Sequence, residues 1–90
     1  MKKICILLAA YNGEKWIEKQ ILTILNQKKV KIDLFISDDC SDDKTFEKIK
    51  KISIKKKNVF FWKNKTKSGS ATQNFFNLIK KINFKKYDFI

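Results

Sequence analysis

The sequence of 90 residues contains no arginine, no histidine and no proline, and only two glycines and two cysteines. Without histidine the chain cannot assemble a Ser-His or Cys-His nucleophile. A zinc site is disfavoured as well, because Cys5 and Cys40 are not at ligand spacing and imidazole is missing. Two cysteines are too few for a disulfide framework, so we expect a reducing, cytoplasmic environment.

Long apolar runs are also missing. The first run, residues 4–10, is far shorter than the roughly 20 residues that cross a bilayer, and no signal-peptide pattern follows it. A hydrophobic content of 43% is typical of a globular chain, and 90 residues suffice for one small domain. We therefore expect a cytoplasmic protein that is at most peripheral at the inner membrane face.

The net charge of +12 comes entirely from 21 lysines. Such an excess attracts nucleic acid or an anionic membrane surface. Readers of nucleic acid usually recruit arginine, whose fork binds bases bidentately, so its absence argues against a nucleic-acid partner. A lysine-rich and arginine-free composition is also typical of an AT-rich genome. A small basic α/β module that binds nucleic acid or an anionic membrane surface remains the alternative function.

Apolar runs that predict buried strands alternate with amphipathic helical patterns. The predicted helices span about residues 14–28, a segment capped by Asp42 or Asp43, and a segment around residues 75–82. The predicted strands are residues 4–8, 32–36, 59–62 and 87–90. The order β-α-β-α-β-α-β predicts an α/β fold with a Rossmann-like, three-layer parallel sheet. Because the last strand stops on the final residue, we expect the domain to be truncated.

Two adjacent carboxylates, Asp38 and Asp39, follow the second predicted strand. In open α/β sheets, ligands bind in the crevice outside the carboxyl ends of the strands. The pair is suited to accept hydrogen bonds from a ligand or to hold a cation. Alternatively, one carboxylate caps the following turn and the other is solvated.

Three further candidates lie beside predicted strand ends. Tyr11 is placed to stack on a nucleobase, or alternatively to pack as a rim tyrosine on the next helix. Glu14 is either a favourable charge near a helix N-terminus or a polar contact to a ligand. The loop around Gly69 either offers N–H groups to a phosphate or is an ordinary loop capped by Ser70.

Three segments in order, residues 6–13, 24–27 and 36–45, resemble the start of family 2 glycosyltransferases. The resemblance covers the whole chain, residues 1–90, and is nearest in character to bacterial rhamnosyltransferase-like members that build surface polysaccharides. It implies the GT-A fold, whose Rossmann-like half binds a nucleotide sugar. The chain is then the N-terminal, incomplete part of such a domain.

The resemblance also implies a binding site for a UDP- or dTDP-sugar donor. It places the backbone of Ala9 and the ring of Tyr11 against the nucleotide. Asp39, with Asp38 beside it, accepts a hydrogen bond from the base or ribose, and the segment from Gly69 lines the sugar side. A carboxylate suits uracil or thymine, whose imide N–H needs an acceptor. The prediction includes Glu14 as a further polar contact.

The family's divalent cation, Mg or Mn, is held by an Asp-x-Asp motif after the fourth strand. The sequence reaches Ile90 before any such motif, and Asp88 matches an acid inside the strand. The general base that would deprotonate a glycan or lipid-linked acceptor is not identified either. We therefore predict a donor-nucleotide half-site that is inactive alone. A receiver-type module is a weaker alternative, because residues 59–63 supply no phosphorylatable aspartate.

Overall fold

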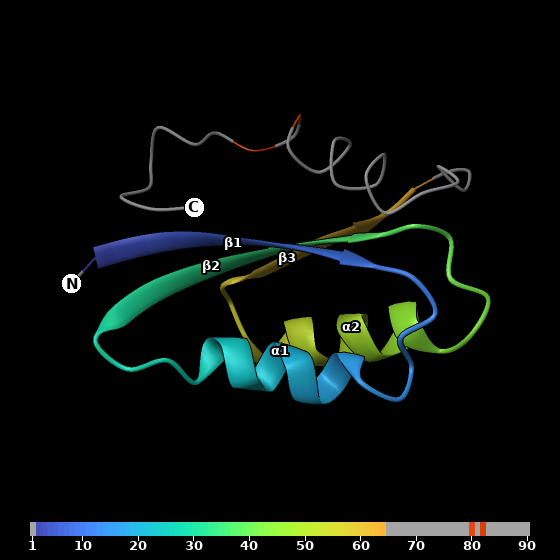
Figure 1. Cartoon of the computed structure of the whole chain (residues 1–90), viewed down its shortest axis with the longest axis horizontal. Coiled ribbons are helices and arrows are strands. Elements are labelled where there is room, and N and C mark those ends of the chain that lie inside the picture. The colour runs from blue at the N-terminus through green and yellow to red at the C-terminus, as the bar shows by residue number, and fades with distance from the viewer. Residues whose placement is uncertain (1, 65–79, 81, 83–90) are drawn as a thin grey trace.

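The computed structural model of the chain describes residues 2–64, 80 and 82. Three strands and two helices alternate along the described part, as predicted (Figure 1). They are β1 (Lys2–Ala10), α1 (Ile17–Leu25), β2 (Val30–Asp38), α2 (Thr45–Lys55) and β3 (Val59–Lys63). The predicted third helix and fourth strand lie outside the described residues.

The three strands form a parallel sheet in the order β1-β2-β3. Its register aligns the carboxyl ends of the strands, since Ala10 pairs with Asp38 and Asp38 pairs with Lys63. A parallel pair needs a crossover connection, which α1 and α2 supply here. The segments that follow the three strands therefore leave the sheet side by side at one edge.

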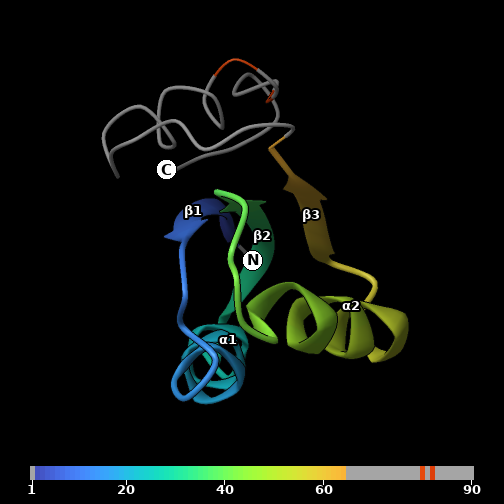
Figure 2. The ribbon, with the colours of Figure 1, turned by 90° about the vertical axis from the view of Figure 1, so that its right-hand side faces the viewer.

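Both helices cover the same face of the sheet (Figures 1 and 2). The alternate residues of each strand that face them form the core with the inner faces of the helices. Its fully buried members include Ile21, Leu34, Ile36 and Ile49. The predicted buried face of α2 is thus confirmed at Ile49, while Phe46 is half-buried and its ring meets Phe61 edge-on at 5.6 Å.

The opposite face of the sheet is apolar too. The rings of Phe35 and Phe60 stack there at 4.9 Å, and Cys5 is fully buried. Burial, with the nearby charge of Asp33, raises the pKa of the Cys5 thiol to about 11, so Cys5 acts as a small core residue. The third layer of the predicted fold would need the third predicted helix, which lies outside the described residues.

Element boundaries differ from the predicted ones. The strands β1 and β2 are longer than the apolar runs alone indicated, because the ladder extends over lysines and acids at their ends. Helix α1 begins at Ile17 instead of Glu14, since a turn intervenes in which the Gly13 carbonyl accepts the N–H groups of Trp16 and Ile17. In the part of the chain that the structure describes, no helix combines the length and apolarity needed to cross a bilayer.

Candidate functional site

The carboxyl edge of the sheet brings together three segments that are distant in sequence. They are the β1–α1 loop (residues 11–16), the β2–α2 loop (residues 39–44) and Asn64, which directly follows β3. A backbone hydrogen bond of 2.9 Å from the Asp39 N–H to the Ala10 carbonyl joins the first two segments. A second one, of 2.8 Å from the Asn64 N–H to the Asp38 carbonyl, joins the last two.

Asp38 is fully buried and shapes the turn that follows β2. One carboxylate oxygen accepts the Ser41 N–H at 3.0 Å, and the other accepts the Ser41 hydroxyl at 2.5 Å. A buried carboxylate is tolerated only with such partners. This is the capping role that the sequence left open for one member of the acid pair.

Asp39 has a different environment, although it is the adjacent residue. It is 5% exposed, so it is not the solvated member that the alternative interpretation assumed. Its Oδ1 accepts a hydrogen bond of 3.0 Å from the Asn64 Nδ2. The carboxylate is therefore held at the sheet edge from the side of β3.

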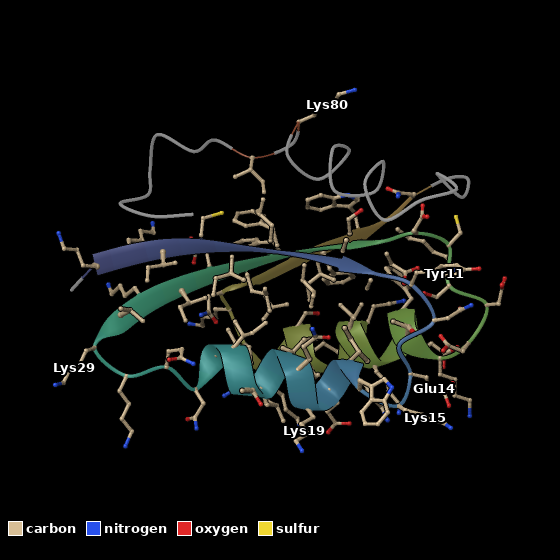
Figure 3. The ribbon with its side chains drawn as sticks, viewed as in Figure 1. Tyr11, Glu14, Lys15, Lys19, Lys29 and Lys80 are labelled. Atoms are coloured by element: carbon tan, nitrogen blue, oxygen red, sulfur yellow. The ribbon has the colours of Figure 1, made fainter. Side chains whose placement is uncertain are left out.

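The residue after Tyr11 fastens the first loop to the second. The N–H of Asn12 donates to the Ser41 hydroxyl at 2.9 Å, and its side-chain oxygen accepts the Asp42 N–H at 2.7 Å. Asn12 adopts a φ of 48°, a left-handed conformation that asparagine tolerates better than most residues. Tyr11 itself is 48% exposed and lies at the level of the strand ends (Figure 3).

Glu14 makes a second link between the two loops. Its N–H donates to the Asp43 Oδ2 at 3.1 Å, and its own Oε1 accepts the Lys44 N–H at 2.8 Å. The Glu14 carbonyl also accepts the Lys48 ammonium at 2.8 Å. Glu14 lies beside the start of α1, on the helix side of Tyr11 (Figure 3), and borders the hollow between the two helices. Its contacts thus serve the loop–loop link, and a ligand contact by Glu14 stays a prediction.

Asp43 completes this link and begins α2. Its Oδ1 accepts the N–H of Thr45 at 2.9 Å and also the Thr45 hydroxyl. These bonds lower the pKa of Asp43, the hydroxyl bond most, because they favour the charged carboxylate. Lys44 occupies the formal cap position, but Asp43 supplies the cap-type hydrogen bond predicted for Asp42 or Asp43.

Asn64 is the site residue that sequence reasoning missed. Besides the contacts to Asp38 and Asp39, its side-chain oxygen accepts the Ser37 hydroxyl at 3.4 Å and its carbonyl accepts the Cys40 thiol at 2.7 Å. A polar residue directly after the third strand was the available signal. The position of a single residue in the sequence does not show which neighbouring strand end its side chain contacts.

The remaining predicted site residues differ in what can be said of them. Ala9 lies in β1 opposite Ser37, on the face of the sheet away from the helices. Gly69 lies outside the described residues. Within residues 2–64, no three cysteine or acidic side chains converge as metal ligands. Both oxygens of Asp38 accept hydrogen bonds from Ser41 in the turn, and a cation contact by the acid pair stays a prediction.

The chain is similar in sequence to known glycosyltransferases. A family model described as Glycosyl transferase family 2 matches residues 5–76. The dTDP-rhamnosyl transferase RfbG of Shigella flexneri is 39% identical over 84 residues, which are 92% of this chain and 29% of RfbG. An uncharacterised glycosyltransferase of Haemophilus influenzae is 38% identical over 79% of this chain and 28% of its own length.

Solved structures agree with this assignment. TarS of S. aureus in complex with UDP is 27% identical, has a TM-score of 0.75 and shares 92% of this chain and 25% of its own. A mannosyltransferase from Pyrobaculum calidifontis, solved with GDP-Man and Mn2+, has a TM-score of 0.78 at 15% identity, which shows the fold alone. It shares 91% of this chain and 25% of its own.

This chain thus spans between a quarter and three-tenths of the length of these relatives. The parallel α/β sheet is the Rossmann-like arrangement of the GT-A neighbours. The family match covers most of the chain, including both helices, β2, β3 and β1 from residue 5 onward. The chain belongs to glycosyl transferase family 2.

Proposed function

We propose that the carboxyl edge of this sheet is the nucleotide half-site for a UDP- or dTDP-sugar donor. The observation that carries the proposal is the placement of Tyr11 and Asp39 directly after neighbouring strand ends, Ala10 and Asp38, which pair in register. An exposed aromatic ring and a carboxylate then border the same edge. Base stacking on such a ring contributes roughly 1–3 kcal/mol.

Asp39 is the proposed acceptor for the imide N–H of uracil or thymine, or for a ribose hydroxyl. Asp38 serves the site indirectly, because its carboxylate holds the turn that carries Asp39. A carboxylate at this position disfavours bases that present an acceptor there. The names of two relatives, one acting with dTDP-rhamnose and one bound to UDP, support the same choice of pyrimidine donors.

Calorimetric titration of the 90-residue chain with UDP, dTDP, GDP and ADP tests the proposal. We expect weak binding of the two pyrimidine diphosphates and weaker or no binding of the purine ones. Asp39→Ala removes the acceptor and should abolish binding, whereas Asp33→Ala, in the middle of β2, is the matched control and should leave it unchanged. Equal binding of all four nucleotides, or full binding by Asp39→Ala, would refute the proposal.

For the whole enzyme, we propose transfer of the sugar to a glycan or lipid-linked acceptor during surface-polysaccharide synthesis at the inner membrane face. A divalent cation, Mg or Mn, would neutralise the diphosphate leaving group. The sequence of 90 residues contains no Asp-x-Asp motif, so we propose that this chain binds the donor without transferring sugar. Donor-dependent turnover measured on this chain would contradict that.

A further inference from the structure

The outer surface of the helix layer has an uneven distribution of charge. Residues 44–57, which contain α2, carry seven lysines and one glutamate, and so hold half of the net charge of +12. Residues 14–26, which contain α1, carry two lysines and two glutamates. Within residues 2–64, no lysine of α2 pairs with a carboxylate. The excess positive charge of the helix layer is therefore concentrated on α2 and the residues that flank it.

Large apolar side chains are exposed on the same layer. Ile54 in α2 is 84% exposed, and Leu22 in α1 is 43% exposed. Both line one shallow hollow between the helices, together with Lys51, Lys55 and other lysines. Trp16, just before α1, is 68% exposed. Figure 2 shows α1 and α2 side by side on one side of the sheet, and the hollow lined by Leu22 and Ile54 lies between them.

From this combination we infer that the outer surface around α2 docks on an anionic lipid bilayer. Lysines attract anionic headgroups, and exposed aliphatic and indole side chains enter the boundary between headgroups and acyl chains. Figure 3 shows Lys19 of α1 directed away from the sheet, toward the side that would meet the membrane. The candidate donor site lies at the carboxyl edge of the sheet, so docking by the helix layer leaves that edge open.

Charge and side-chain type favour a bilayer over the other polyanions. A nucleic acid offers phosphates to the lysines but no apolar phase for Ile54, and the chain has no arginine for base or phosphate forks. A second copy of the chain is disfavoured, because two α2 surfaces of like charge repel each other. The inference does not depend on donor binding, and its test uses no nucleotide.

The test is co-sedimentation of the chain with vesicles of phosphatidylglycerol and phosphatidylcholine, or of phosphatidylcholine alone. We expect binding to the anionic vesicles, weakened by salt, and little binding to the neutral ones. The double variant Lys51→Glu/Lys55→Glu should lower the partition coefficient by at least about tenfold. Ile54→Ser should lower it several-fold at unchanged charge and thermal stability, because the side chain is exposed.

The matched control is Lys2→Glu/Lys31→Glu, which changes the net charge equally at the amino ends of β1 and β2. It should retain most of the vesicle binding. An equal loss in this control would show that net charge alone drives binding and would overturn the inference. The inference would also be overturned if Ile54→Ser bound vesicles as well as the wild type and the wild type bound duplex DNA more tightly than anionic vesicles. A dimer of the wild type that Lys51→Glu/Lys55→Glu dissociates would overturn it too.

Discussion

Replacing Asn64 by alanine tests whether the third strand end holds the proposed donor-binding carboxylate in place. The variant loses the Nδ2 hydrogen bond to Asp39 at 3.0 Å and the weaker contact from the Ser37 hydroxyl at 3.4 Å. It keeps the backbone bonds of residue 64 to Asp38 and Cys40. The substitution therefore removes only hydrogen bonds of the Asn64 side chain, of which the bond to Asp39 is the shorter.

The magnitude follows from the burial of Asp39, which is 5% exposed. A hydrogen bond to a charged group contributes about 1.5–3 kcal/mol, and a buried carboxylate that loses one has little water to replace it. We expect the free energy of unfolding to fall by about this amount. We also expect UDP or dTDP to bind about tenfold more weakly, because the carboxylate is no longer held in one orientation.

The chain offers a close control for this prediction. The side chain of Asn58 also bridges β3 to β2, since its Nδ2 donates to the Ile32 carbonyl at the opposite end of the sheet. Asn58→Ala should cost about 1 kcal/mol of stability and leave nucleotide affinity unchanged. Urea unfolding and calorimetric titration of both variants separate the two effects. If Asn64→Ala binds nucleotide as tightly as Asn58→Ala does, the positioning role is wrong.

A second substitution at the same position should make nucleotide affinity depend on pH. Asn64→Asp places two carboxyl groups side by side, so like-charge repulsion raises the pKa of one of them. At low pH the new carboxyl is protonated and donates to Asp39 as the amide does. As pH rises through that raised pKa, nucleotide affinity should fall in the variant and stay level in the wild type. Parallel pH profiles for the two proteins would count against the role of Asn64.

Three further predictions concern the frame of the site. Ile49→Ala should reduce the free energy of unfolding by about 2–5 kcal/mol in urea titration, since the side chain is fully buried; a loss below 1 kcal/mol would contradict the packing. In the native protein at pH 8, iodoacetamide should modify the half-buried Cys40 and spare Cys5, because the pKa of about 11 keeps the buried Cys5 thiol protonated. Equal labelling of both cysteines, measured by mass spectrometry, would contradict the burial of Cys5. The hydrogen bond from Thr45 lowers the pKa of Asp43, so the charged carboxylate stabilises the fold above the usual carboxyl pKa, and this stabilisation is lost as pH falls through the lowered pKa. Asp43→Asn should therefore be less stable than the wild type at neutral pH, and the difference in the free energy of unfolding should shrink as pH is lowered. A difference that stays constant with pH would refute the assignment.

The described part of the fold could be predicted from the sequence because each strand there is an apolar run and each helix has apolar residues at helical spacing. The strand runs are apolar except at Asp33, as expected for a sheet with two largely apolar faces. Ile17 and Ile21 recur at helical spacing in α1, as Ile49 and Ile52 do in α2. The start of α1 was misjudged, because Glu14 resembles a first-turn acid while the Gly13 carbonyl forms a turn before the helix begins. Periodicity carries no information about such a local turn.

The site was predicted only in part, since it depends on contacts between loops. The acid pair identified the sheet edge, but the adjacent positions of Asp38 and Asp39 do not reveal that Ser41 bonds one and Asn64 the other. The contacts of Asn12 with the second loop span about 30 positions of sequence and follow no spacing rule. Such partners emerge only when the parallel register aligns the strand ends.

The bonds between the first two loops have a practical consequence for any redesign of the proposed donor site. Asn12 contacts Ser41 and Asp42, and Glu14 exchanges bonds with Asp43 and the residue after it. Transplanting only one of the two segments, with different residues at these positions, would leave hydrogen-bonding groups of the other segment without their partners. A chimaera should therefore exchange residues 11–16 and 39–44 together. A mutant library aimed at the proposed donor site should likewise vary both segments at the same time.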